Sequence, residues 1–99
     1  MEKKHYAYML ICADNTIYSG YTINIENRLK THNEGKGAKY TKYRLPVRLA
    51  YLEEFKTKSE ALHREIELKK LTRKKKECLI QKYKKSNIYE NWKKKNIYI

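Results

Sequence analysis

The stretch HYAYMLICADNTIYSGYT, residues 5–22, decides the fold, because it contains two strands and the turn that joins them. Residues 5–12 are apolar or aromatic at both sets of alternating positions, which predicts a central strand covered on both faces. Asp14 and Asn15 form a turn-like pair, and residues 16–22 predict a second strand that returns beside the first. Gly20 weakens the interior of that strand, which indicates a bulge or the close approach of another group.

The length of the turn determines whether Tyr8 and Tyr18 lie on one face of the hairpin. Side chains alternate along a strand, so the two tyrosines share a face only if the turn has an odd number of residues. A turn made of Ala13, Asp14 and Asn15 would bring them together, whereas a turn of Asp14 and Asn15 alone would separate them. A shared site for both tyrosines therefore predicts the three-residue turn.

Start and stop signals divide the rest of the chain into further elements. Asn24 can cap a helix that runs to about Asn33, and Gly35 is placed to end it. A glycine-rich basic loop over residues 35–44 then leads to a third strand over residues 47–55.

Two more helices are predicted after the third strand. Ser59 or Thr57 can cap a helix that ends near Leu71, and Thr72 can cap the last one, which ends near Tyr83. The order β-β-α-β-α-α predicts an α+β fold, a small three-stranded antiparallel sheet flanked by helices. We expect residues 1–83 to form one domain and residues 84–99 to be a basic extension, either a short helix or a tail.

Composition limits what the chain can bind. Its 99 residues suit one small domain, and 24 Lys and Arg against 11 acidic residues give a formal charge of +13. Nucleic acid is the partner that this imbalance favours, although a basic structural protein of ribosomal type or a biased composition would also produce it. No apolar run is long enough to span a bilayer, and no signal peptide is seen. Cys12 and Cys78 lack metal or disulfide spacing, so we expect a cytoplasmic protein.

Polar side chains occupy apolar stripes on two of the predicted helices. At about 100° per residue, His32 falls in the stripe of the first helix and Arg28 at its edge. Glu65 likewise falls among the apolar positions of the second helix, where a carboxylate needs a partner. Lys69, four residues on, could provide an ordinary ion pair, so a structural Glu65 and a metal-binding Glu65 both remain open.

Taken together, these residues resemble the GIY-YIG nuclease superfamily, and most of all its small stand-alone bacterial members. The resemblance rests on YAYML and YSG, then Arg28 and His32, then ALHREIELKKLT, and it extends from residue 5 to about residue 82. Tyr6-Ala7-Tyr8 and Tyr18-Ser19-Gly20 correspond to the two motifs that name the family. The fold that the family implies, a three-stranded antiparallel sheet with helices, agrees with the predicted order of elements.

The resemblance implies a metal-assisted endonuclease that hydrolyses phosphodiester bonds, usually in DNA. Its catalytic residues would be Tyr8, Tyr18, Arg28, His32 and Glu65. Tyr18 would position or deprotonate the attacking water, with His32 as the alternative base, and Arg28 would contact the scissile phosphate. Glu65 would hold one divalent metal, Mg²⁺ or Mn²⁺, next to a phosphate oxygen.

The chain departs from the family pattern at Tyr21, where several relatives carry a lysine after the second motif. One phosphate contact would then come from another basic residue, Lys36, Lys39 or Lys42. Arg73 and Lys74 extend the expected DNA-binding surface, and Gly20 would keep the strand open for the phosphate.

The expected substrate is DNA, single-stranded or branched, with RNA left open and the protein acting as a monomer. A non-catalytic basic module that binds DNA or RNA is the alternative function. A carboxylate among phosphates argues against that alternative, because without a metal Glu65 would repel the substrate.

Overall fold

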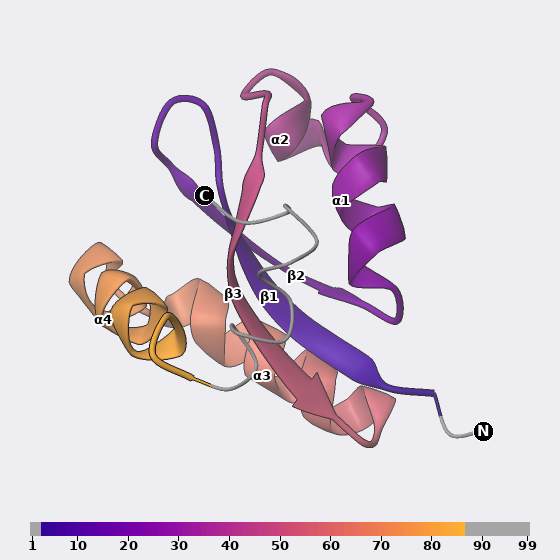
Figure 1. The fold of residues 1–99 in the computed structure, drawn as a ribbon, viewed down its shortest axis with the longest axis vertical. Coiled ribbons are helices and arrows are strands. Elements are labelled where there is room, and N and C mark those ends of the chain that lie inside the picture. The colour runs from indigo at the N-terminus through magenta and orange to yellow at the C-terminus, as the bar shows by residue number, and fades with distance from the viewer. Residues whose placement is uncertain (1–2, 87–99) are drawn as a thin grey trace.

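The computed structural model describes residues 3–86 and confirms the predicted fold class (Figure 1). Its elements in chain order are β1 (His5–Ile11), β2 (Ile17–Thr22), α1 (Ile25–Asn33), α2 (Lys39–Lys42), β3 (Arg48–Phe55), α3 (Lys58–Lys70) and α4 (Arg73–Tyr83). The one element that was not predicted is α2, a single turn within the expected loop. Most of the expected basic extension, from residue 87 onward, lies outside the described residues.

The three strands form one antiparallel sheet in the order β2-β1-β3. The central place of β1 confirms the prediction from its continuous apolar pattern, and Ala7, Met9 and Leu10 are completely buried within it. The pairing of β1 with β3 shifts between Met9 and Leu10, whose partners are Tyr51 and Leu49. Such a bulge adds local twist to the strand that carries it.

The turn between β1 and β2 has three residues. The Cys12 amide donates to the Thr16 carbonyl at 2.9 Å, and this pair closes a loop of Ala13, Asp14 and Asn15. Asn15 has a φ of 69°, a left-handed conformation that asparagine tolerates better than most residues. The odd-numbered turn that a shared tyrosine site requires is therefore present.

The resulting register places both tyrosines on the same face of the sheet. Tyr8 lies opposite Gly20, and Leu10 lies opposite Tyr18. Because Tyr8 and Leu10 are two residues apart on β1, their side chains and that of Tyr18 point to the same side.

Helix caps fix the starts of the helices that carry the candidate residues. The Asn24 side chain accepts from the Asn27 amide at 3.0 Å, and Gly35, with a φ of 78°, follows the end of α1. Thr57, and not Ser59, caps α3. Thr72 caps α4 as predicted.

Helices lie on both sides of the sheet, with α1 and α2 on one side and α3 and α4 on the other (Figure 1). Side-chain contacts agree with this view, because Tyr8 bonds to His32 of α1 and Tyr51 packs on Tyr83 of α4. The helix α3 lies against β1 and β2, the two strands that carry the tyrosines. No helix within residues 3–86 has the length and apolar character that crossing a membrane requires.

Candidate active site

The Tyr8 side chain lies at the centre of the candidate site, and Gly20 makes room for it. Only 1% of Tyr8 is exposed. A Cβ added at residue 20 would overlap the Tyr8 ring and hydroxyl, so no side chain fits there. The space that we expected Gly20 to leave for a phosphate is occupied by the phenol of Tyr8. Gly20 thus serves the site through Tyr8, and the close approach that its strand position indicated comes from within the protein.

The Tyr8 hydroxyl begins a chain of hydrogen bonds that continues through His32 to Thr41. It lies 3.0 Å from His32 Nε2, and His32 Nδ1 lies 2.8 Å from the Thr41 hydroxyl oxygen. Thr41 gives its single hydroxyl proton to the Ala38 carbonyl at 3.2 Å. This donation favours the His32 tautomer that donates from Nδ1 to Thr41 and accepts the Tyr8 proton at Nε2.

Both members of the Tyr8–His32 pair are neutral near pH 7. Burial, reinforced by the Arg28 charge, lowers the pKa of His32 to about 4. Burial also raises the pKa of Tyr8 to about 12, although Arg28 acts in the opposite direction. His32 is fully buried and both of its nitrogens are engaged, so its lone pair is not available to a water molecule. The position of His32 therefore favours a role in holding the Tyr8 side chain. It does not favour the role of alternative base that the sequence suggested.

Arg28 joins the same cluster from α1. Its Nε donates to the Tyr8 hydroxyl at 3.4 Å, and its Nη2 donates to the Gly37 carbonyl at 3.0 Å. Its other terminal nitrogen, Nη1, makes no hydrogen bond to the part of the chain that the structure describes. A Cβ on Gly37 would overlap the His32 ring, so this glycine also belongs to the site. Sequence reasoning missed Gly37, although the repeated glycines of residues 35–37 were a signal of close packing.

Tyr18 is held by aromatic contacts. Its ring meets His32 edge-on, with centroids 5.4 Å apart, and stacks on Tyr40 at 5.9 Å. Tyr40 also carries the Arg44 guanidinium 4.0 Å from its ring centroid, and Arg44 is held by Asp14 at 3.0 Å. The column from Asp14 through Arg44 and Tyr40 thus supports Tyr18. Both faces of this arrangement depend on Tyr40, which contacts Tyr18 and Arg44 within the protein.

Glu65 approaches the cluster from α3. Its side chain is 18% exposed and pairs with Lys69 at 3.3 Å, as the helical spacing predicted. Burial is the main cause of the raised pKa of Tyr8, and the charges of Tyr18 and Glu65 add to it. Direct contacts therefore join four of the predicted catalytic residues, Tyr8, Tyr18, Arg28 and His32, and Glu65 acts on this cluster through its charge.

The protein offers a metal ion one carboxylate rather than a closed cage. Within residues 3–86, no three His, Cys, Asp or Glu side chains gather closely enough to enclose a metal. Magnesium is commonly bound by one or two carboxylates, with waters and substrate phosphates completing its octahedron. A single half-buried carboxylate such as that of Glu65 fits the protein's share of such a site.

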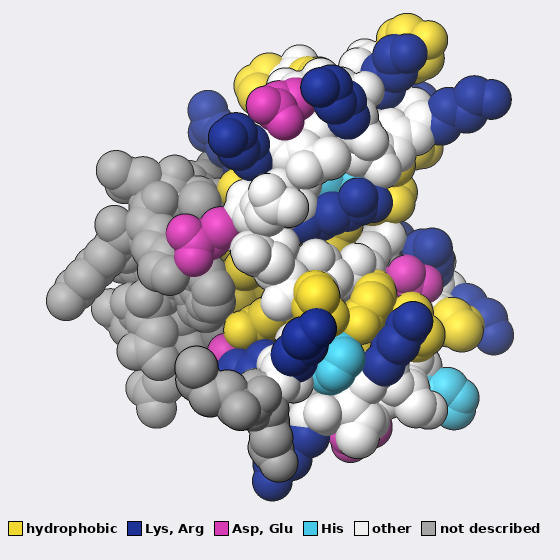
Figure 2. Space-filling view, turned by 90° about the vertical axis from the view of Figure 1, so that its right-hand side faces the viewer, with side chains coloured by type: hydrophobic (Ala, Val, Ile, Leu, Met, Phe, Trp, Pro, Cys, Tyr) yellow, Lys and Arg dark blue, Asp and Glu magenta, His cyan; other side chains and the backbone are white. Residues whose placement is uncertain are grey.

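The expected DNA-binding residues differ in whether their side chains are free for a ligand or bonded within the protein. Lys36, Lys39, Lys42 and Lys74 are exposed, and Figure 2 shows basic side chains across the side of the molecule on which α1 lies. Arg73, in contrast, bonds to Glu77 at 2.7 Å and to the Asn15 carbonyl.

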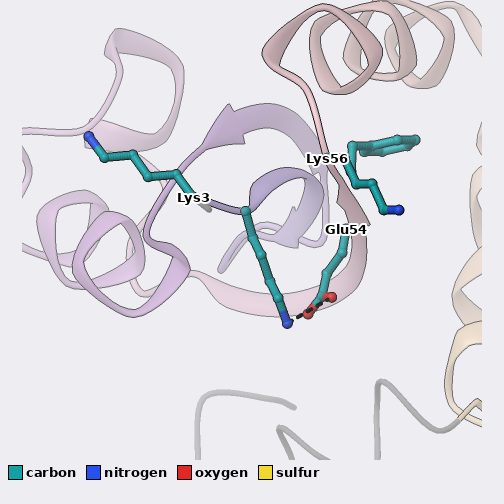
Figure 3. A pocket seen from close by; sticks show the side chains of 5 residues that line it. Lys3, Glu54 and Lys56 are labelled. Atoms are coloured by element: carbon teal, nitrogen blue, oxygen red, sulfur yellow. Dashed lines mark ion pairs between the residues drawn. The ribbon is translucent and has the colours of Figure 1, made fainter. Parts of the chain in front are cut away.

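Tyr21 and a large surface hollow both lie apart from the tyrosine cluster. Tyr21 points to the opposite face of the sheet from Tyr8, where its hydroxyl meets His5 Nδ1 at 2.8 Å. The hollow, of about 310 Å³, lies where β1 begins and β3 ends, and Figure 3 shows the Lys4–Glu54 ion pair at its wall.

Comparison with known proteins gives consistent results. The family described as the GIY-YIG catalytic domain matches residues 4–84. The UPF0213 protein RBAM_000440 of Bacillus velezensis is 55% identical over 83% of each chain, and the UPF0213 protein YazA of Bacillus subtilis is 54% identical over the same shares. The solution NMR structure of the protein EF2693 from E. faecalis matches with a TM-score of 0.58 and 45% identity over 88% of this chain and 95% of that one. The solution NMR structure of the UPF0213 protein BH0048 from Bacillus halodurans matches with a TM-score of 0.54 and 46% identity, over 89% of this chain and 92% of that one.

Proposed function

The chain belongs to the family of the GIY-YIG catalytic domain, and from this premise we propose that it is a metal-dependent endonuclease that cuts DNA. The observation that supports the proposal is the cluster around the Tyr8 hydroxyl. A guanidinium, two phenols and a neutral histidine that fixes one of the phenols are in contact there, and the charge of the Glu65 carboxylate acts on the same hydroxyl. A protein that only binds nucleic acid has no need for a carboxylate in that position.

Tyr18 is the group that we assign to the attacking water. The Tyr8 hydroxyl is buried and already bonded to His32, whereas Tyr18 is half-buried and its hydroxyl makes no hydrogen bond within residues 3–86. Tyr18 would orient the water and, as phenolate, take its proton. His32 would act through Tyr8, as a positioning residue rather than as a base.

Arg28 and a metal ion held by Glu65 would stabilise the negative charge of the phosphate. The Nη1 edge of Arg28 is available to a phosphate oxygen while Nε and Nη2 hold the guanidinium in place. Glu65 would hold one Mg²⁺ or Mn²⁺, which supplies positive charge to the phosphate as negative charge develops there. Before a metal ion binds, the ion pair with Lys69 neutralises the Glu65 carboxylate.

The substrate that we propose is single-stranded or distorted DNA, bound by a monomer. Tyr43 is 79% exposed and offers its ring to an unpaired base. All five site residues come from one chain, so a second copy is not needed to complete the site. A cytoplasmic location fits the two free cysteines, Cys12 and Cys78.

A cleavage assay on labelled single-stranded, duplex and branched DNA, and on single-stranded RNA, tests the proposal. Each substrate is incubated with Mg²⁺, Mn²⁺ or EDTA. Native protein is compared with Glu65→Gln and with Glu67→Gln, an exposed glutamate of the same helix that serves as the matched control. We expect metal-dependent cutting by the native and Glu67→Gln proteins and a loss of at least about a hundredfold in Glu65→Gln.

The same assay can support the alternative function. Binding without cutting in every metal, equal in the native protein and Glu65→Gln, would identify a basic binding module. It would also reduce Glu65 to one half of an ion pair with Lys69.

A further inference from the structure

A groove of about 230 Å³ lies beside Tyr18, at the edge of the cluster around Tyr8. It is lined by Ile17, Tyr18, Ser19, Tyr40, Lys69 and Lys76. These residues come from β2, α2, α3 and α4, so the groove extends from the proposed catalytic tyrosine toward the two C-terminal helices. Its lining includes two lysines and no acidic side chain.

Lys76 is unusual among the basic residues of the protein. The half-buried Lys and Arg side chains within residues 3–86 are Arg28, Arg44, Arg64 and Lys76. The three arginines all have protein partners: Arg28 bonds to Gly37, Arg44 to Asp14 and Arg64 to Glu53. Lys76 makes no ion pair or side-chain hydrogen bond with any residue in this range. Lys76 is thus the one of these four side chains without a polar partner within residues 3–86, which leaves its ammonium available to an anionic ligand.

Ser19 gives an independent sign that the groove is incomplete. Its side chain is 3% exposed, and its hydroxyl is the one buried side-chain polar atom within residues 3–86 that has no hydrogen-bond partner. Buried hydroxyls nearly always have a partner. Ser19 and Lys76 line the same groove, and each has a proton to donate to an oxygen ligand.

Lys69 adds a second positive charge to the groove. It is half-exposed and pairs with Glu65 at 3.3 Å, so it stands between the carboxylate and the groove. The hollow shown in Figure 3 differs, because Lys3, Lys4 and Lys56 at its wall are all exposed and no buried polar atom there lacks a partner. The groove beside Tyr18 is therefore the better candidate for an anion site.

We propose that this groove binds a second phosphate of the substrate strand, next to the one that is cut, with Lys76 as its main contact. The inference rests on the proposed function for the nature of the strand. The strand would run from Arg28, across Tyr18, to Lys76 between α2 and the C-terminal helices. Two phosphates held on either side of Tyr18 would fix the position of the scissile bond relative to that hydroxyl.

Binding measured in EDTA tests the proposal without any cleavage. The probe is a short fluorescent single-stranded DNA, and a series of probes replaces one phosphate at a time with a neutral methylphosphonate. The proteins are native, Lys76→Gln and the matched control Lys75→Gln, whose side chain lines a different hollow between α3 and α4. Thermal unfolding of all three proteins checks that they are folded.

We expect Lys76→Gln to bind at least about threefold more weakly than Lys75→Gln and to reduce the slope of log K against log salt by about 0.7. One methylphosphonate position should weaken the native protein and Lys75→Gln but leave Lys76→Gln unchanged. Equal affinities for the two variants, or no binding by the native protein, would overturn the inference. If binding follows the expected pattern but no DNA is ever cut, the phosphate site stands and the proposed catalysis fails.

Discussion

At the scale of single residues, the site depends on side chains that sequence reasoning could not place. The five catalytic candidates were predicted from the resemblance to the GIY-YIG family, but the residues that contact them were not. Thr41 lies in a lysine-rich loop without apolar periodicity, so no pattern marks its hydroxyl as buried. Gly20 was expected to leave room for a phosphate, and the Tyr8 ring that fills this space was not predicted, because the direction of a ring is a rotamer and not a sequence pattern.

Replacing Thr41 tests the hydrogen-bond chain. Thr41→Val keeps the shape of the side chain but removes the acceptor of the His32 Nδ1 proton, while Thr41→Ser keeps it. A buried donor without a partner costs about 1–3 kcal/mol, so we expect this loss of unfolding free energy in Thr41→Val. Urea unfolding measures it. Recovery of most of the loss in Thr41→Ser is expected, and equal stability of the two variants would contradict the assigned chain.

A methyl group at residue 20 tests the contact with Tyr8. Gly20→Ala places a Cβ where the Tyr8 ring lies, so we expect a loss of about 1–3 kcal/mol from overpacking. Chemical denaturation of Gly20→Ala, Tyr8→Ala and the double variant forms the required cycle. The double variant should lose clearly less stability than the sum of the single changes, and strict additivity would show that the two residues do not compete for space.

His32 predicts a particular dependence of stability on pH. Its pKa is about 4 in the folded protein and near 6.5 in an unfolded chain. The unfolded state therefore binds more protons between these values, so the contribution of neutral His32 is complete above pH 6.5 and is lost as the pH falls toward 4. The loss is up to about 3 kcal/mol. Denaturation across this range should show a shallower slope in His32→Gln than in the native protein, and identical slopes would exclude the assignment.

At the scale of elements, the sequence predicted most of what the structure contains. The strands and long helices have strong periodic patterns and recognisable caps, and the odd-numbered turn followed from alternation alone. The helix α2 has only four residues inside a glycine-rich loop, too few to show a helical period. The connection between α4 and the hairpin turn was also missed, because it joins Arg73 to Asn15 across most of the chain.

We expect Arg73 to stabilise the position of α4 and not to contact DNA. Arg73→Gln removes its bonds to Asn15 and Glu77, so we expect a stability loss of about 1 kcal/mol. Lys74→Gln removes the same charge from an exposed side chain and should leave stability within about 0.5 kcal/mol. Unfolding curves and DNA affinity are measured for both. If Arg73→Gln loses less stability than Lys74→Gln, the structural role of Arg73 is wrong and Arg73 is again a candidate for contact with DNA.

At the scale of the whole molecule, the charge of +13 acts on stability as well as on binding. Lys and Arg outnumber acidic residues 24 to 11, so like charges repel one another in the compact state. Sodium chloride shortens the range of that repulsion to about 8 Å at physiological ionic strength. We expect the unfolding midpoint in urea to rise between low salt and physiological salt. A fall over this range would show that attractive ion pairs outweigh the repulsion.

Three contacts join the turn at residues 13–15 to two other parts of the protein, at Arg44 and at Arg73. The Ala13 amide bonds to the Arg44 carbonyl, Asp14 pairs with the Arg44 side chain, and the Asn15 carbonyl accepts from Arg73. Over evolutionary time, an insertion or deletion of one residue here would rotate Tyr18 to the other face of the sheet and break all three connections at once. Descendants of this gene should therefore gain and lose residues elsewhere, while the number of residues between Tyr8 and Tyr18 stays the same.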